Sequence, residues 1–229
     1  MELNPRLRVI ASCVTDVKTM ADIGTDHGYI PVALIEKGMM LSAIACDVNA
    51  NPLEKAKKTI KDYGFDRSIE TRLGSGLSVL KPGEVEAIVI AGMGGLLIRD
   101  LLEAQPEVAD AAKKLVLQPM NNQSAVRRYL EIHGFKIICE ELAQEGDRIY
   151  EIIVAQKGVM MVTDPLDYEL GYQAVQTKHR LLKAHINRKI RFEEKILDHT
   201  RGKSTPMAQT QFLESQAFIK RLNEVKKCL

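Results

Sequence analysis

The fold of this chain is decided by the stretch Met20-Ala-Asp-Ile-Gly-Thr-Asp-His-Gly-Tyr-Ile-Pro31, where a short apolar run breaks at two glycines and continues as an apolar helical pattern. The run before Gly24 predicts a buried strand, and the residues after Gly28 predict a helix. A strand, a glycine turn and a helix bring free backbone N–H groups and the positive end of a helix dipole to one point. Glycines also let a ligand approach the backbone closely. We therefore expect a ligand-binding turn here.

Four further strands, each followed by a polar or glycine-rich turn, continue the pattern. They are expected at residues 42–47, 69–73, 86–91 and 115–117. Alternating strands and helices indicate a parallel sheet with right-handed crossovers, whose carboxyl edge binds ligands. The segments 135–142 and 148–155 have no helix between them and predict an antiparallel hairpin. We therefore expect an α/β fold, with a Rossmann-like doubly wound sheet and a closing hairpin over residues 1–160.

Residues 161–229 lack strand patterns and predict a separate domain, an α-helical hairpin or coiled coil. Apolar residues recur at helical spacing on either side of the turn Gly202-Lys-Ser-Thr-Pro206. From residue 166 onward the chain has 13 Lys or Arg against 7 Asp or Glu, whereas residues 1–165 have 19 against 23. This basic excess fits a polyanionic partner such as RNA, and it also fits a solvated coiled coil that docks on the first domain or on another subunit.

Composition argues against several classes of protein. The four cysteines contain no Cys-x-x-Cys pair, so neither a zinc ribbon nor a disulfide framework is indicated, and no metal is expected. No run approaches the ~20 apolar residues of a membrane span, and no secretion leader is recognisable. We therefore expect a cytoplasmic protein with no membrane partner. The composition does not decide the oligomeric state, for which a monomer is one option.

Two acids end the first two predicted strands. Asp47, at the tip of the second strand, could accept hydrogen bonds from both ribose hydroxyls of an adenosine cofactor, or could merely cap a turn. The dinucleotide pattern Gly-x-Gly-x-x-Gly is absent, which argues against a nicotinamide-dependent oxidoreductase. The string that begins at Asp22, Asp-x-Gly-x-x-x-Gly, instead resembles the first motif of class I S-adenosylmethionine-dependent methyltransferases.

Four strings occur together in this sequence: Ala21-Asp-Ile-Gly-Thr-Asp-His-Gly-Tyr-Ile-Pro31, Gly74-Ser-Gly-Leu77, Ile90-Ala-Gly-Met-Gly-Gly95 and Leu117-Gln-Pro-Met-Asn121. Together they resemble the bacterial tRNA (adenine-22-N1)-methyltransferase family, TrmK, and the resemblance covers the whole chain. It implies S-adenosyl-L-methionine as cofactor, tRNA as partner and methyl transfer to N1 of adenine 22. The family usually has an acid where Ser75 stands, so the resemblance implies a weaker contact with the cofactor's adenine here.

The resemblance also implies roles for several residues of these strings. The cofactor's methionine end would lie against Asp22, Ile23, Gly24, His27 and Gly28. Its adenosine would lie against Asp47, Val48, Ser75, Gly76 and Leu77, with Gly92, Met93 and Gly94 close by. The RNA would contact Pro119, Asn121 and, on the basic face of the helical hairpin, Lys189 and Arg191.

Asp26 and Tyr29 are the candidate catalytic residues. Adenine N1 has an available lone pair, so its methylation requires positioning more than a strong base. The product ring is cationic, and the Asp26 carboxylate could stabilise that charge while Tyr29 stacks on the base. The alternatives are a helix cap for Asp26 and a position at the core edge for Tyr29. The string Asn/Asp-Pro-Pro-Tyr/Phe, typical of exocyclic amine methylation, is absent, which favours a ring nitrogen.

Three classes of function remain open at this point: a tRNA methyltransferase, a nicotinamide-dependent oxidoreductase, and a non-catalytic RNA-binding protein of the same fold. A methyltransferase that acts on another RNA site or on a small molecule is a further alternative. In the first case the target base must be unpaired or extruded, because N1 lies on the Watson–Crick edge.

Overall fold

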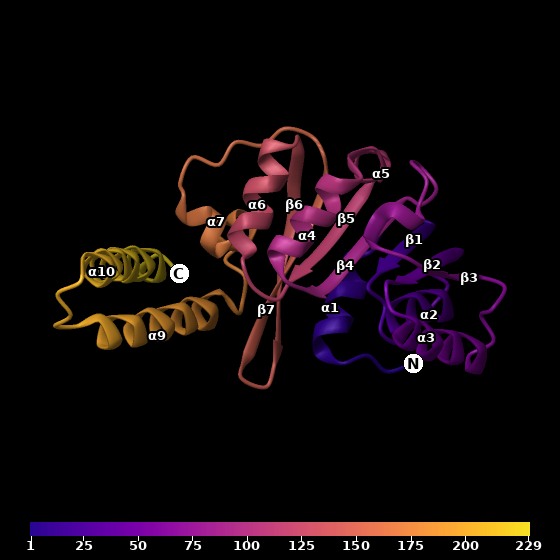
Figure 1. Ribbon diagram of the computed structural model, residues 1–229, viewed down its shortest axis with the longest axis horizontal. Coiled ribbons are helices and arrows are strands. Elements are labelled where there is room, and N and C mark those ends of the chain that lie inside the picture. Colours follow the sequence, from indigo (N-terminus) through magenta and orange to yellow (C-terminus); the bar gives the residue numbers. More distant parts are fainter. The chain divides into compact units, whose positions relative to one another are not determined.

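The computed structural model describes residues 1–229, which form two compact units, Met1–Gln173 and Ala174–Leu229. The first unit is built on a seven-stranded sheet of order β3-β2-β1-β4-β5-β7-β6 (Figure 1). Its strands are β1 (Thr19–Ile23), β2 (Ser42–Asp47), β3 (Ile69–Leu73), β4 (Ala87–Met93), β5 (Lys114–Pro119), β6 (Phe135–Glu145) and β7 (Arg148–Lys157).

The sheet is parallel from β1 to β5, whereas β7 runs antiparallel to both of its neighbours, β5 and β6. The predicted Rossmann-like sheet with its closing hairpin is therefore confirmed. β4 is longer than predicted because its pairing with β5 shifts register between Ala91 and Met93, which carries the strand through Gly92.

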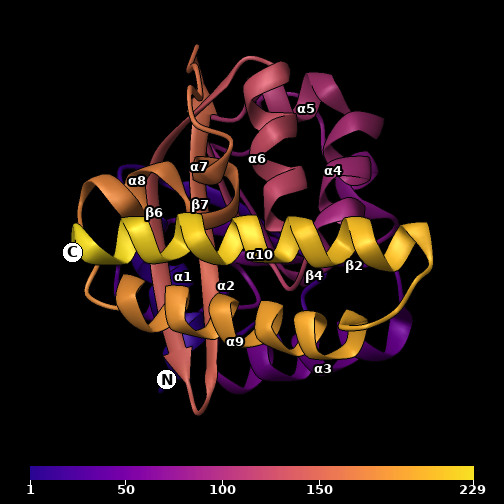
Figure 2. The same cartoon turned by 90° about the vertical axis from the view of Figure 1, so that its left-hand side faces the viewer.

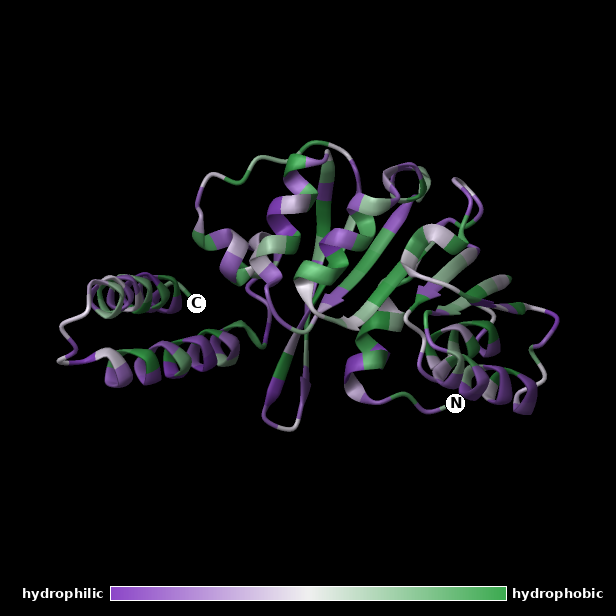
Figure 3. Cartoon of the chain, in the orientation of Figure 1, coloured by the Kyte–Doolittle hydropathy of each residue, from purple (hydrophilic) through white to green (hydrophobic).

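Helices cover both faces of this sheet, and the strands between them are apolar (Figure 3). One face holds α1 (Pro5–Cys13), α2 (Tyr29–Glu36) and α3 (Ala50–Asp62). The other holds α4 (Gly95–Ala104), α5 (Pro106–Ala111) and α6 (Gln123–Ile132), and a single turn, η1 (Gly76–Val79), follows β3. Alternate residues of each strand enter the two cores. Because the strands are buried on both faces, they read in the sequence as apolar runs rather than as alternating patterns.

A buried ionic group fixes the end of the first unit. The Arg127 guanidinium donates hydrogen bonds to Glu140 at 2.6 Å and Glu151 at 2.7 Å, and all three side chains are at most 4% exposed. Arg127 also donates to the backbone carbonyl of Tyr168 in α7 (Leu166–Leu170) at 2.8 Å. Because this contact holds α7 to the sheet, the boundary between the units lies after Gln173 rather than after residue 160.

The second unit is the predicted helical hairpin. After the short α8 (Tyr172–Gln176), α9 (Leu182–Thr200) and α10 (Pro206–Lys227) lie side by side (Figures 1 and 2). Leu182, Ile186 and Leu222 are fully buried within this unit. None of the helices of the protein combines the length and the apolar character that crossing a membrane requires.

Candidate functional site

The turn from β1 to α2 is held mainly by its own backbone. The N–H groups of Gly24 and Thr25 both donate to the Cys46 carbonyl at 2.8 Å, and the Gly28 N–H donates to the Thr25 hydroxyl oxygen at 3.1 Å. Gly24 has φ +77°, a conformation that favours glycine, and a Cβ there would displace the end of the flexible Met93 side chain. Gly28 is the N-cap of α2 and provides no side-chain cap, so the first N–H groups of the helix remain open at the turn.

Two buried acids stand beside this turn. Burial raises the pKa of Asp22 to about 6, a hydrogen bond with the Thr25 side chain acts in the opposite direction, and the neighbouring Asp47 raises the pKa further. No basic side chain forms a salt bridge with Asp22. Asp47 accepts one hydrogen bond, from the Asn49 N–H to Oδ1 at 2.7 Å, so its other oxygen can accept from a ligand. A buried acid without a cation fits a site that a positively charged ligand completes.

Two adjoining cavities lie along this edge of the sheet. The Asp47 cavity has a volume of about 250 Å³. The predicted cofactor residues that line it are Ile23, Gly24, Asp47, Val48, Ser75, Gly76, Gly92 and Met93. The Asp26 cavity has a volume of about 360 Å³. The predicted residues that line it are Asp22, Gly24, Asp26, His27, Gly28, Tyr29 and Gly92. Both cavities reach Gly24, Ala91 and Gly92, so they form one groove.

The acceptor side of this groove contains the two candidate catalytic residues. The Asp26 carboxylate is 66% exposed and lies 3.3 Å from His27 Nε2 and 3.5 Å from Lys55 Nζ. It does not cap α2, because the N-cap residue is Gly28. The ring of Tyr29 stacks on that of His27, with 4.9 Å between centroids and an interplanar angle of 6°. Asp26 and Tyr29 therefore line the same cavity, as expected, and their catalytic roles stay predictions.

Several predicted contact residues lie outside both cavities. Leu77 is 1% exposed in the core between the sheet and α4–α6, Pro119 is buried at the end of β5, and Gly94 is the N-cap of α4. Asn121 Oδ1 accepts hydrogen bonds from the Gly95 N–H at 3.3 Å and from Asn122 Nδ2 at 3.1 Å, so Asn121 ties two turns together. Lys189 and Arg191 belong to α9 of the second unit, where Arg191 is exposed and Lys189 is half-buried.

Arg6 is the charged residue of the groove that the sequence patterns missed. It enters the Asp26 cavity from α1, and its Nη1 donates to Gln118 Oε1 at 2.7 Å. Its Cζ lies 5.6 Å from the centroid of the Tyr150 ring, and no carboxylate forms a salt bridge with it. In the sequence an apolar stripe recurs at helical spacing from residue 3 to residue 14, and Arg6 lies off it, a position that left a phosphate contact and a solvated side chain both open. Other lining residues that the patterns missed are Asn4, Leu7, Thr25, Ile30, Cys46, Asn49, Gly74, Ala91, Leu97 and Leu101.

No group of three or more His, Cys, Asp or Glu side chains is arranged to hold a metal ion. The groove itself contains charged and aromatic side chains. It presents carboxylates for positive groups of a ligand, a guanidinium for a negative one, and an aromatic stack on the acceptor side.

Comparison with known proteins gives the family. A family model described as a methyltransferase domain matches residues 3–153. The tRNA (adenine(22)-N(1))-methyltransferase of Bacillus subtilis (strain 168) is 35% identical over 158 residues, which span 69% of this chain and 66% of that protein, just under two thirds of its length.

Solved structures agree over the whole chain. Sp1610 of Streptococcus pneumoniae, provisionally assigned as a tRNA (m1A22) methyltransferase, matches with a TM-score of 0.89 at 30% identity, over 98% of this chain and 100% of that chain. The same protein in complex with S-adenosyl-L-methionine gives a TM-score of 0.87. The B. subtilis m1A22 tRNA methyltransferase TrmK gives 0.88 at 28% identity, over 98% and 99% of the two chains. This chain therefore belongs to the tRNA (adenine-22-N1)-methyltransferase family.

Proposed function

We propose that this protein transfers the methyl group of S-adenosyl-L-methionine to N1 of adenine 22 in tRNA. The observation that carries the proposal is the continuous groove past Gly24. Its Asp47 end offers a carboxylate to a ribose, and its Asp26 end offers a carboxylate and an aromatic stack to a base. Sp1610, which shares this fold over its whole length, was solved with S-adenosyl-L-methionine bound.

The residues of the groove fit this cofactor. Asp47 would accept hydrogen bonds from the ribose hydroxyls beside Val48, and the adenine would lie against Ser75 and Gly76. Asp22, buried without a cation, would hold the ammonium group of the methionine. Arg6, which forms no salt bridge, would hold the carboxylate. When bound, the cofactor supplies a methyl group activated by a sulfonium.

The acceptor side would position the base and stabilise charge. In the transfer, the N1 lone pair of adenine would bond to the methyl carbon as the bond from that carbon to the sulfonium sulfur breaks. The neutral thioether S-adenosylhomocysteine would leave, and the product ring would carry positive charge over N1, C6 and N6. Asp26 would stabilise that charge and accept a hydrogen bond from N6, in an orientation fixed by His27 and Lys55. Tyr29 would stack on the base, which must be unpaired to expose N1.

Recognition of the folded RNA would involve the second unit. Phosphate contacts account for much of the affinity of proteins for nucleic acids, and folded RNA is recognised largely by its shape. The first unit would then perform catalysis, while Lys189 and Arg191 of α9 would contact the phosphate backbone of the tRNA. Pro119 and Asn121 would act on the substrate indirectly, by holding the turns after β4 and β5.

The test is methyl transfer from labelled S-adenosyl-L-methionine to bulk bacterial tRNA, followed by nucleoside analysis. Wild type should form 1-methyladenosine. Asp26→Ala should lower kcat about 10²-fold, as is typical when one preorganised electrostatic group is removed, with an unchanged Kd for S-adenosylhomocysteine. Asp100→Ala, which removes an exposed carboxylate on α4, is the matched control. Cofactor binding without methylated tRNA would reject the RNA substrate and direct the search to a small acceptor.

A further inference from the structure

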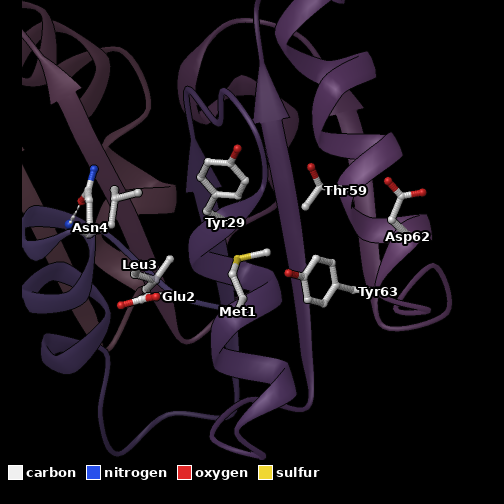
Figure 4. Close-up of a pocket in the computed structure, with 9 residues that line it drawn as sticks. Met1, Glu2, Leu3, Asn4, Tyr29, Thr59, Asp62 and Tyr63 are labelled. Carbon is white, nitrogen blue, oxygen red and sulfur yellow. Dashed lines mark hydrogen bonds between the residues drawn. The ribbon is translucent and has the colours of Figure 1, made fainter.

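A third cavity adjoins the Asp26 cavity on the side of α2 and α3. This Tyr63 cavity has a volume of about 470 Å³ and is the largest of the three. It is lined by Met1–Asn4 and Leu7 on one side and by Tyr29, Thr59, Asp62 and Tyr63 on the other (Figure 4). Asn4, Leu7 and Tyr29 line both this cavity and the Asp26 cavity. Its volume falls in the range of about 300–1,000 Å³ that small-molecule sites occupy.

Two aromatic rings from different elements face this cavity. Tyr29 at the start of α2 and Tyr63 just after α3 both line the cavity, and Figure 4 shows the Tyr63 ring directed toward Met1. Tyr29 is 39% exposed and Tyr63 is 42% exposed. His27 stacks on one face of the Tyr29 ring. Exposed aromatic rings of this kind are the usual platforms on which unpaired bases stack.

The charges around the cavity distinguish a base from a phosphate. Glu2 and Asp62 contribute carboxylates to the lining, no Lys or Arg belongs to it, and the ammonium of the lining residue Met1 is paired with Glu36. Carboxylates repel phosphate and accept hydrogen bonds from the amino groups of bases. Lys55 and Lys58 lie one helical turn before Thr59 and Asp62 on α3, which places positive charge beside the cavity, although Lys55 Nζ also lies 3.5 Å from Asp26 Oδ1. An unpaired nucleotide needs this combination, with its base inside and its phosphates at the rim.

We infer that the Tyr63 cavity binds the unpaired base that neighbours the methylated adenine in the RNA. The inference rests on the proposed function, because it assigns a second nucleotide of the same substrate. The neighbouring base stacks on Tyr63, while the target adenine occupies the Asp26 cavity on the other side of Tyr29. A neighbour held in this way prevents the extruded adenine from returning to its own stack.

The first experiment compares wild type, Tyr63→Ala and Tyr63→Phe in binding to tRNA and to S-adenosylhomocysteine. Loss of one stacked base should raise the Kd for tRNA about tenfold in Tyr63→Ala. Tyr63→Phe should restore wild-type affinity, and all three proteins should bind S-adenosylhomocysteine equally. Ile132→Ala, which removes an exposed apolar side chain at the far end of α6, is the control and should match wild type.

The second experiment reports stacking directly and needs no catalysis. A tRNA carries 2-aminopurine at either neighbour of adenine 22, and its fluorescence is followed as the protein with bound S-adenosylhomocysteine is added. Wild type should quench one of the two labels, and Tyr63→Ala should not. Absence of quenching at both positions, or a changed affinity of Tyr63→Ala for S-adenosylhomocysteine, would overturn the inference. Failure of the proposed function would show differently, as absence of 1-methyladenosine with the wild-type protein.

Discussion

At the scale of single residues, the groove contains charges that lack their counterparts. Asp22 is a buried carboxylate without a cation, and Arg6 is a guanidinium without a carboxylate. A buried unpaired charge costs stability in the ligand-free protein. A zwitterionic ligand such as an amino acid moiety would supply both missing partners. These two residues therefore make separate predictions about the two charged groups of the cofactor.

The first prediction concerns the pH dependence of binding. The ammonium group binds the deprotonated form of Asp22, whose pKa is about 6. The Kd for S-adenosylhomocysteine should thus be constant above about pH 7 and should rise as the pH falls through about 6, approaching tenfold per unit. Asp22→Asn should bind more weakly, with no such dependence. Calorimetric titrations between about pH 5 and 8 measure both, and a constant wild-type Kd over that range would contradict the assignment.

The stability of the ligand-free protein provides a control, because the substitution Asp22→Asn should raise this stability although it weakens cofactor binding. Because the pKa of Asp22 in the folded protein lies above its ordinary value of 3.8, folding favours the protonated acid. That contribution to the free energy of unfolding is present below about pH 4 and is lost as the pH rises through about 6. Without ligand, Asp22→Asn should therefore melt at a higher temperature than wild type at pH 8, although it binds the cofactor less tightly.

The second prediction concerns Arg6 and the cofactor's carboxylate. Arg6→Gln should raise the Kd for S-adenosylmethionine about 10- to 100-fold, because a hydrogen bond between charged groups contributes about 1.5–3 kcal/mol. It should leave the Kd for decarboxylated S-adenosylmethionine unchanged, since that ligand lacks the group in question. Arg8→Gln, with a side chain that is 62% exposed, is the matched control. If Arg6→Gln raised the Kd for both ligands equally, Arg6 would not be the residue that binds the cofactor's carboxylate.

At the scale of elements, the groove depends on how two strand–helix turns fit together. The Gly95 N–H at the start of α4 donates to the Asn121 carbonyl at 3.0 Å. A side chain at Gly95 would overlap the backbone carbonyls of Asn121 and Asn122 after β5, which cannot move aside as a flexible side chain can. At Gly94 an added Cβ would meet only the side-chain oxygen of Asn121, at 3.2 Å.

The third prediction follows from this difference between adjacent glycines. Gly95→Ala should lower the free energy of unfolding by about 1–3 kcal/mol, the usual cost of overpacking, and should lower the affinity for the cofactor by separating the turns. Gly94→Ala should cost clearly less, because the Asn121 side chain can rotate. Urea denaturation of the two variants measures both effects. Equal destabilisation would show that the turn after β4 yields to a side chain at either position.

The sequence predicts the parts of this molecule that depend on local patterns, and it does not predict those that depend on contacts between residues far apart in the chain. The strands were predictable because each is an apolar run ended by a glycine or polar turn, and the residues from Asp22 to Tyr29 lie together as one motif predicts. Arg6 and Gln118 lie 112 positions apart in the sequence, so no local sequence pattern predicts the hydrogen bond between them. Leu77 and Asn121 were expected to contact ligands, but a motif shows only that a residue lies near the site. It cannot show that the Leu77 side chain enters the core or that the Asn121 side chain holds a turn.

At the scale of the whole molecule, the two structural units have net charges of opposite sign. Ala174–Leu229 has 13 Lys or Arg against 5 Asp or Glu, whereas Met1–Gln173 has 19 against 25. The contrast is sharper than at residue 165, because the acids of α7 belong with the sheet. An acidic catalytic unit suits a cationic cofactor and a cationic product base. A polyanionic RNA then requires positive charge elsewhere, and the helical hairpin provides it.

The last prediction tests this division of labour. The double variant Lys189→Glu and Arg191→Glu should raise the Kd for tRNA about tenfold or more at moderate salt, with an unchanged Kd for S-adenosylhomocysteine. Since each lost phosphate contact removes about 0.7–0.9 from the slope of log Kd against log salt, the slope should fall by about 1 to 2. The control variant Lys18→Glu and Lys37→Glu makes the same change in net charge at the edge of the sheet opposite the groove. Equal losses in both double variants would mean that total charge, rather than the hairpin, binds the RNA.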